Sequence, residues 1–160
     1  MPILWLRALL FTAFVPVMVG GIVPLAIARG APAAAGLSQT GWIAVAAGGA
    51  IYLLSLLQFL ASGGTPMIFF ARRARAVFGE EPPVLVCRGV YRVSRNPMYL
   101  AVLLAAGGLA IVFASVTMAV YAAALAVFFQ IVVVAVEEPH LRRRHGAAFD
   151  AYCRRVRRWW

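Results

Sequence analysis

Lysine is absent from this sequence of 160 residues, and acidic residues number only five. Charged residues make up 12% of the chain and hydrophobic residues 64%, whereas soluble domains have roughly 25% and 45–50%. This shortage of charge excludes a soluble globule and a disordered chain, because too few polar side chains exist to cover a surface that faces water. Two cysteines are too few for a disulfide scaffold. The composition therefore predicts an integral membrane protein.

Long runs without charge mark the candidate membrane spans, each of which needs about 20 apolar residues. The first run covers residues 8–28, and the second has its apolar centre at 41–62. The uncharged run 96–136 is too long for one span and predicts a helical hairpin with a turn at 113–115. The first helix of this hairpin, 98–113, would be only about 24 Å long. We therefore expect an all-α integral membrane protein with about four transmembrane helices, the third and fourth of which form the hairpin.

The spans themselves hold small residues and no ionisable ones. Glycine pairs at 20–21, 48–49 and 107–108 predict close packing between helices, a reading that we prefer to a ligand contact. Ion-coupled transporters usually need a charged group within the membrane, so its absence argues against a four-helix transporter. The first span is expected to remain in the protein, because its apolar run is longer than the roughly 7–15 residues of a signal peptide.

Arginines indicate the orientation of the chain. Six lie between the second and third spans, and seven follow the fourth. With four spans, both groups and Arg7 fall on one side of the membrane, whereas Arg29 falls on the other. Because arginine-rich loops stay in the cytosol, we expect both termini to be cytoplasmic and place the protein in a cytoplasmic membrane. Cys87 and Cys153 then face the cytosol as free thiols, and the basic balance indicates contact with membrane lipid and not with nucleic acid.

Residues suited to chemistry gather in two clusters on the predicted cytoplasmic face. The first ends the loop 63–97, where Arg95 precedes Asn96 and Pro97. The Asn-Pro pair predicts a helix start, since proline is tolerated in the first turn. The free N–H groups and the positive dipole end of that turn, with Arg95 beside them, suit a carboxylate.

The second cluster directly follows the fourth span and consists of two carboxylates, a proline and a histidine: Glu137, Glu138, Pro139 and His140. Adjacent carboxylates at a membrane boundary are costly unless they have partners. They suit either a solvated helix end with Arg142 and Arg143 as counter-ions, or a pocket for a cation or for ribose hydroxyls. Together with Tyr91 and Tyr99, the two clusters fit a zwitterionic ligand that carries a sulfonium or ammonium group. No zinc-site spacing links the cysteines to a histidine, so we expect no metal.

The order and spacing of these residues resemble the isoprenylcysteine carboxyl methyltransferase family and, in part, the phosphatidylethanolamine N-methyltransferases. The resemblance covers residues 63–160 and rests on this pattern: Gly64-Thr65-Pro66, Gly89-x-Tyr91-x-x-x-Arg95-Asn96-Pro97-x-Tyr99, a helical hairpin, Glu137-Glu138-x-x-Leu141, then Gly146, Tyr152 and Val156. It implies a bacterial helical membrane enzyme that uses S-adenosylmethionine in a pocket facing the cytosol, with a lipophilic acceptor entering from the bilayer. Two N-terminal spans (1–62) and a methyltransferase core (63–160) would form one structural domain.

By position, the resemblance implies a set of cofactor-binding residues: Val84, Leu85, Val86, Tyr91, Arg95, Asn96, Pro97, Met98, Tyr99, Glu137 and Glu138. Arg95 would orient its segment or meet the methionine carboxylate, and a tail helix over 139–155 would fold across the site as a lid. A carboxylate acceptor needs no base, whereas an amine or thiol acceptor must lose a proton. The catalytic residue is therefore not determined, and the candidates are Arg95, Glu137, His140 and His145.

The acceptor also stays open. The carboxyl methyltransferases carry an arginine for the substrate one turn before the glutamates, where this chain has Val133 and Val134. This difference argues against a prenylcysteine carboxylate and leaves an aminophospholipid or a small hydrophobic carboxylate or thiol as further choices. Asn96 stands where the eukaryotic carboxyl methyltransferases have histidine. Asparagine at this position is common among bacterial relatives and lipid N-methyltransferases. A protein that keeps the fold without catalysis is the other alternative, although the Arg-Asn-Pro and Glu-Glu motifs are both intact. The sequence does not determine an oligomeric state.

Overall fold

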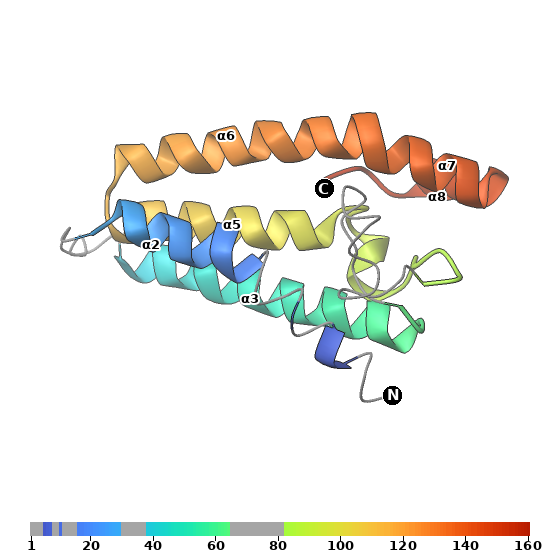
Figure 1. The fold of residues 1–160 in the computed structure, drawn as a ribbon, viewed down its shortest axis with the longest axis horizontal. Helices are drawn as coiled ribbons and strands as arrows, with labels where there is room; N and C mark the ends of the chain where they lie inside the picture. The colour runs from blue at the N-terminus through green and yellow to red at the C-terminus, as the bar shows by residue number, and fades with distance from the viewer. Residues whose placement is uncertain (1–4, 8–9, 11–15, 30–37, 65–81) are drawn as a thin grey trace.

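The structure, a computed structural model, describes residues 5–7, 10, 16–29, 38–64 and 82–160. All regular elements in these ranges are helices, which confirms the predicted all-α membrane protein (Figure 1). Two helices are long and apolar enough to cross a membrane, Ser38–Ala61 and Val116–His145. Two shorter apolar helices accompany them, Met18–Ile27 and Pro97–Val112, so the count of four spans stays a prediction.

The elements follow one another in this order: η1 (Met18–Ile22), α2 (Val23–Ile27), α3 (Ser38–Ala61), η3 (Gly89–Arg92), α5 (Pro97–Val112), α6 (Val116–Val132), η4 (Val133–Glu137), α7 (Glu138–His145) and α8 (Ala147–Arg155). Here η1 and η4 are π-helical turns and η3 is a 3₁₀ turn. The predicted start of the first span and the Thr65-Pro66 pair of the family pattern lie outside the described residues.

The predicted second span and the hairpin are both confirmed. α3 covers the expected apolar centre, and α5 and α6 are joined by the expected short turn. Ala114 in this turn has a positive φ of 45°, which lets the chain reverse at once. The hydroxyl of Ser115 then accepts a hydrogen bond from the N–H of Met118 at 3.3 Å and caps the first turn of α6.

Glycines let α3 and α5 pack at very close range. A Cβ atom added to Gly41 would lie 2.6 Å from the carbonyl oxygen of Gly108, and one added to Gly108 would lie 2.7 Å from that of Gly41. A Cβ atom added to Gly48 would lie 2.6 Å from the carbonyl oxygen of Ala101 in α5. Gly49 and Gly107 have nothing within 4 Å of such an atom. The predicted close packing is therefore confirmed for one glycine of each of these pairs.

The predicted tail helix over 139–155 is present, but as two helices, α7 and α8, divided at Gly146. The fourth span continues through η4 and α7 as one helix, Val116–His145. Pro139 lacks an N–H and crowds the carbonyl group four residues earlier, which would normally break a helix. The π-helical turn before it absorbs this misfit, because the N–H of Glu138 bonds to the carbonyl of Val133, five residues back.

The chain reverses instead at Gly146, whose φ of 51° and ψ of −127° suit glycine alone. This turn sends α8 back along α7 (Figure 1). Phe149, Tyr152 and Val156 form a buried cluster there, against which Leu85 and other partly buried residues pack. The part of the tail that folds back is therefore α8 and the residues after it.

Replacing Gly146 by alanine should loosen this fold-back. The variant Gly146→Ala places a side chain at a backbone conformation that costs about 1–3 kcal/mol. We expect faster hydrogen exchange throughout α8 and a lower unfolding temperature in detergent. Gly49→Ala is the matched control, because its added methyl group meets nothing within 4 Å. Equal protection of α8 in Gly146→Ala and the wild type would contradict the assigned turn.

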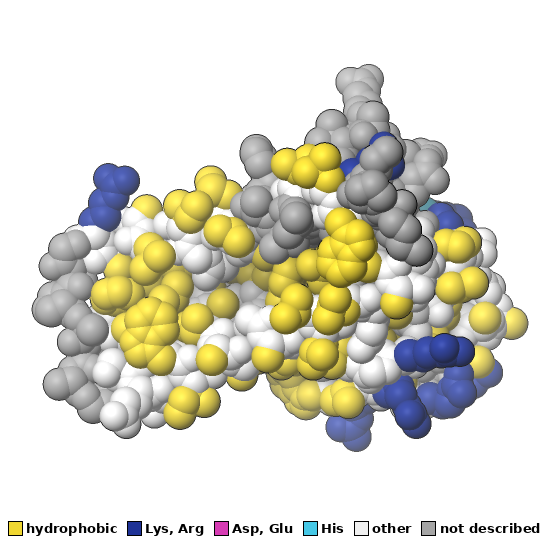
Figure 2. Space-filling model, turned by 90° about the horizontal axis from the view of Figure 1, so that it is seen from below, with side chains coloured by type: hydrophobic (Ala, Val, Ile, Leu, Met, Phe, Trp, Pro, Cys, Tyr) yellow, Lys and Arg dark blue, Asp and Glu magenta, His cyan; other side chains and the backbone are white. Residues whose placement is uncertain are grey.

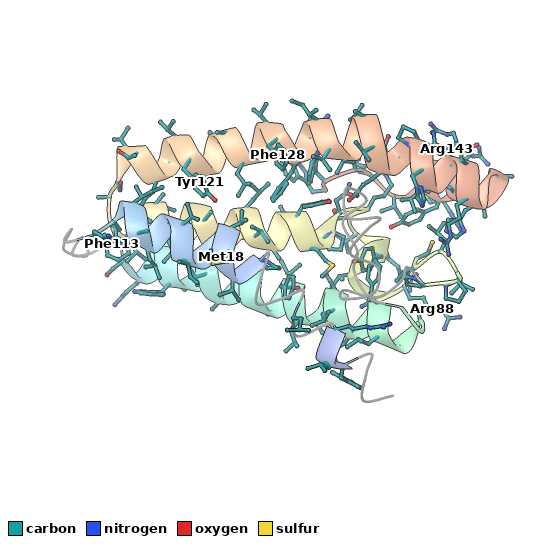
Figure 3. All side chains as sticks on the ribbon, in the orientation of Figure 1. Met18, Arg88, Phe113, Tyr121, Phe128 and Arg143 are labelled. Carbon is teal, nitrogen blue, oxygen red and sulfur yellow. The ribbon has the colours of Figure 1, made fainter. Side chains whose placement is uncertain are left out.

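Basic side chains and apolar side chains occupy different parts of the molecule. Figure 3 places Arg88 and Arg143 at the end formed by η3, α7 and α8, and Phe113 at the opposite end. Exposed apolar residues run along the helices between the ends, among them Trp42, Val120 and Val127. Figure 2 shows apolar side chains spread over one such face. This arrangement suits a bundle surrounded by lipid, with its basic end at the headgroups. The assignment of that end to the cytosol stays a prediction.

Candidate active site

The site begins at the turn between η3 and α5, which rests on the end of α3. Gly89 has a φ of 54°, and any side chain there would collide with the amide of Gln58 in α3. Tyr91 is buried and packs edge-on against Phe59 of α3, with ring centroids 5.6 Å apart. α3 therefore determines where the following residues, 94–96, enter the first turn of α5.

The last residues of the chain hold this turn from the other side. We call residues 156–160 the strap. The N–H of Arg95 donates to the carbonyl of Arg157 at 3.0 Å. The side-chain amide of Asn96 donates to the carbonyl of Arg158 at 2.9 Å, and the Ser94 hydroxyl donates to the same carbonyl at 3.3 Å. The turn that precedes α5 is thus fixed by contacts with residues some 60 positions later in the chain.

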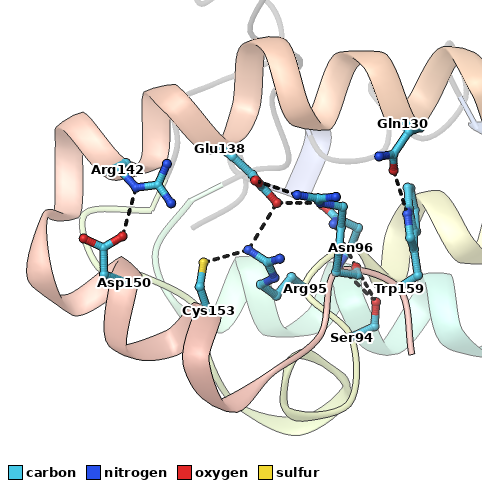
Figure 4. Close-up of polar contacts among 10 residues, drawn as sticks. Ser94, Arg95, Asn96, Gln130, Glu138, Arg142, Asp150, Cys153 and Trp159 are labelled. Carbon is cyan, nitrogen blue, oxygen red and sulfur yellow. Dashed lines mark hydrogen bonds and ion pairs between the residues drawn. The ribbon is translucent and has the colours of Figure 1, made fainter.

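Three charged side chains meet beside this turn (Figure 4). Arg158 contacts both oxygens of the Glu138 carboxylate, Nε to Oε1 at 2.7 Å and Nη2 to Oε2 at 3.0 Å. Nη1 of Arg95 lies 3.1 Å from the same Oε1, and the side chains of Arg95 and Glu138 are each only 13% exposed. We call Arg95, Glu138 and Arg158 the charge cluster. Its two cations and one anion leave one positive charge uncompensated within the cluster.

Arg95 has spare capacity to bind an anion. Its Nη1 also donates to Sγ of Cys153 at 2.6 Å. Its Nε is buried and has no hydrogen-bond partner among the residues that the structure describes. A buried charged donor left unpaired costs at least about 1–3 kcal/mol, so an acceptor at this position would be strongly favoured. A carboxylate fits both the orphaned donor and the surplus positive charge.

The second glutamate bridges the two helices of the hairpin. The Tyr99 hydroxyl, in the first turn of α5, donates to the carboxylate of Glu137 at the end of η4. The ring of Tyr99 also packs against Phe129 of α6, with centroids 4.5 Å apart. Glu137 therefore lies where the charge cluster meets the apolar part of the bundle.

The structure identifies the counter-ions of Glu138, whereas the binding role of the two glutamates stays a prediction. Glu138 pairs with Arg95 and Arg158, and not with Arg142 or Arg143 as at a solvated helix end. Arg142 instead pairs with Asp150 of α8 at 2.9 Å, and both side chains are well exposed. The exposed pair contributes little to stability, whereas Glu138 makes charge-assisted contacts that are partly buried, one of them bidentate.

Other predicted cofactor residues lie around this centre. Pro97 is buried in the first turn of α5, and Met98 packs against Leu56 and Leu60 of α3. The side chain of Tyr91 also faces α3, and its carbonyl accepts a hydrogen bond of 2.6 Å from the buried hydroxyl of Tyr152. The charge cluster and the Tyr99–Glu137 pair therefore form the centre of the site, with these residues behind them.

The remaining predicted residues are more peripheral. Val84 is 58% exposed, Leu85 packs on the α8 cluster, and Val86 is half-buried. His140 and His145 are half-buried on α7, one turn and two turns beyond Glu137. Their roles in binding or proton transfer stay predictions.

Burial alters the titration of groups near the strap. It raises the pKa of Tyr152, so this hydroxyl remains a donor to the backbone of η3 at all ordinary pH values. Burial also raises the pKa of the Cys87 thiol, and the positive charge of Arg155 offsets part of this rise. Contact with Glu138 raises the pKa of Arg158 further, which keeps this side chain charged.

Sequence reasoning missed the strap. Arg158 is predicted only as one of the seven arginines after the fourth span, and nothing is predicted for Trp159. The Trp159 indole donates to the Gln130 amide oxygen at 2.9 Å and packs between α5 and α6. One signal was available. Gln130 is the single amide side chain in the apolar run 116–136, and such a group needs a partner within a span. The partner's position, at the far end of the chain, gave no local pattern.

The fold and the charge cluster together define an apolar helical bundle with a partly buried ionic site at its basic end. Over residues 41–148, more than half of its length, the chain matches the phospholipid methyltransferase family. It therefore belongs to that family and is a membrane methyltransferase. A search of curated proteins and a search of solved structures found no match.

The family match runs from α3 into the start of α8, and so includes Arg95, Tyr99, Glu137 and Glu138 but not the strap. It agrees with the predicted likeness to lipid N-methyltransferases. The finer assignment to the isoprenylcysteine carboxyl methyltransferases and the bacterial source stay predictions.

Proposed function

We propose that this protein is an S-adenosylmethionine-dependent methyltransferase that methylates a lipophilic acceptor in the bilayer. The observation that carries the proposal is the buried, unpaired Nε of Arg95 within a cluster of net positive charge. That donor needs an acceptor, a carboxylate suits it by charge, and a methyl donor built on an amino acid has one. Family membership supports the reaction type.

S-adenosylmethionine, when bound, supplies a methyl group that its sulfonium already activates. The residues of the chain then have to bind, align and exclude water. Arg95 would hold the methionine carboxylate through Nε. Glu138, kept in place by Arg95 and Arg158, would accept hydrogen bonds from the amino group or the ribose, since a carboxylate oxygen has room for more than one donor. Asn96 and Tyr99 would border the same site.

Glu137 is the proton acceptor that the geometry favours. An amine or thiol acceptor must lose a proton, and the group that takes it must lie close to the acceptor. Of the candidate bases, Glu137 lies nearest the apolar spans from which a lipophilic acceptor would come, and Tyr99 holds its carboxylate. His140 and His145 lie further along α7.

An amine or a thiol suits this site better than a carboxylate as the acceptor. One turn before the glutamates, Val133 is 1% exposed and Val134 is 42% exposed. Neither side chain offers a cation to a second carboxylate. We therefore place an aminophospholipid or a lipophilic thiol ahead of a prenylcysteine carboxylate, in keeping with the family that the chain matches.

Calorimetric titration of the detergent-purified protein tests the proposal. We expect saturable binding of S-adenosylmethionine and S-adenosylhomocysteine. Labelled methyl groups should then pass to one acceptor class when vesicles with phosphatidylethanolamine, a farnesyl thiol or a farnesylcysteine derivative are compared. Absence of binding, in protein shown to be folded by its helical circular dichroism and unfolding transition, would refute the proposal.

A further inference from the structure

The strap touches the site on two sides at once. Its carbonyl groups receive three hydrogen bonds from residues 94–96. The Arg158 side chain contacts both oxygens of Glu138, which Figure 4 shows as dashed lines. Trp159 anchors the end of the strap to Gln130 of α6. The strap therefore connects the start of α5 with both α6 and α7.

Arg158 also changes which charge is free to meet a ligand. Without it, Arg95 would be the only cation of the cluster paired with Glu138, and the two charges would neutralise each other. With the bidentate contact of Arg158, Glu138 shares its one negative charge between two arginines, and one positive charge is left over. The charge of Arg95, with its unpaired Nε, then remains available for an anion.

We propose that Arg158 is a positioning residue for the carboxylate of the methyl donor. It balances Glu138, and the backbone of its strap holds Arg95 and Asn96, so that Nε of Arg95 is kept ready for that carboxylate. This inference rests on the proposed function. It adds to that function a specific requirement for Arg158, which lies outside the part of the chain that matches the family.

The test compares S-adenosylmethionine with its decarboxylated analogue, which keeps the sulfonium and the amine but lacks the carboxylate. In Arg158→Gln we expect affinity for S-adenosylmethionine to fall by roughly tenfold or more, as for a lost charged contact. Affinity for the decarboxylated analogue, measured by displacement of labelled donor, should change less than about threefold. Arg158→Lys, which keeps the charge, should restore part of the lost affinity.

Arg154→Gln is the matched control, since it removes an exposed arginine of α8 close to the strap. It should leave both affinities unchanged. Equal weakening of both ligands in Arg158→Gln would show a general structural role and overturn the inference. Tighter binding of S-adenosylmethionine in that variant would also overturn it, because Arg158 would then compete with the donor. If the folded wild type binds neither S-adenosylmethionine nor its decarboxylated analogue, the proposed function itself is refuted. A loss of binding in Arg158→Gln alone, with normal binding by the wild type, concerns only the role of Arg158.

Discussion

Replacing Glu138 by glutamine should weaken binding of S-adenosylhomocysteine on the order of a hundredfold, because hydrogen bonds to a charged group contribute about 1.5–3 kcal/mol each. The amide keeps the shape of the side chain but removes the negative charge that two arginines share. Arg95 and Arg158 would then repel each other across a partly buried site. Both would move, and with them Nε of Arg95 and the strap. Titration calorimetry in detergent measures the loss directly.

Asp150→Asn is the control for this variant. It makes the same chemical change to a carboxylate at the same end of the molecule, in a pair with Arg142 whose side chains are 55% and 43% exposed. Exposed pairs contribute at most about 1 kcal/mol, so cofactor binding should not change. The helical content of both variants should equal that of the wild type, because the contacts between α3 and α5 do not involve either residue. Unchanged affinity in folded Glu138→Gln would remove Glu138 from the site.

The membrane part of the fold could be predicted well because its determinants are local. A run of apolar residues of sufficient length predicts a helix in lipid, and the turn at residues 113–115 follows from the excess length of the run 96–136. The same reasoning ends the fourth span with the uncharged run at residue 136, whereas the helix continues past Pro139 to His145. Proline normally ends a helix, but a π-helical turn depends on how neighbouring helices support it, and the sequence does not show that support.

The site was predicted only in part for a similar reason. Arg95 and the glutamates stand out because charges are rare in this chain, and adjacent carboxylates need partners. Which arginines serve as those partners depends on the path of the last residues. Arg142 is closest in sequence to Glu138 but pairs with Asp150, because the reversal at Gly146 brings α8 alongside α7. Arg158, twenty residues away, reaches Glu138 by the same reversal.

Replacing Gly108 by alanine should be among the most damaging single changes in the membrane part of the protein. A Cβ atom there would lie 2.7 Å from the carbonyl oxygen of Gly41 and 2.9 Å from the side chain of Val45. The carbonyl belongs to a helix backbone that cannot rotate away, so α3 and α5 must separate. Overpacking of this kind costs about 1–3 kcal/mol, and sometimes more. Because α3 supports η3 through Gln58, the damage should extend to the site and weaken binding of S-adenosylhomocysteine as well.

Gly107→Ala separates this effect from the general consequences of adding a methyl group to α5. The two glycines are adjacent in the same helix, but an added Cβ at Gly107 meets nothing within 4 Å. Alanine also has a better helix propensity than glycine, by about 0.8–1.0 kcal/mol in water. We therefore expect Gly107→Ala to unfold at or above the wild-type temperature in detergent, and Gly108→Ala well below it. Similar unfolding temperatures for the two variants would mean that α3 and α5 are not packed through this glycine, and would remove the support on which the position of Arg95 depends.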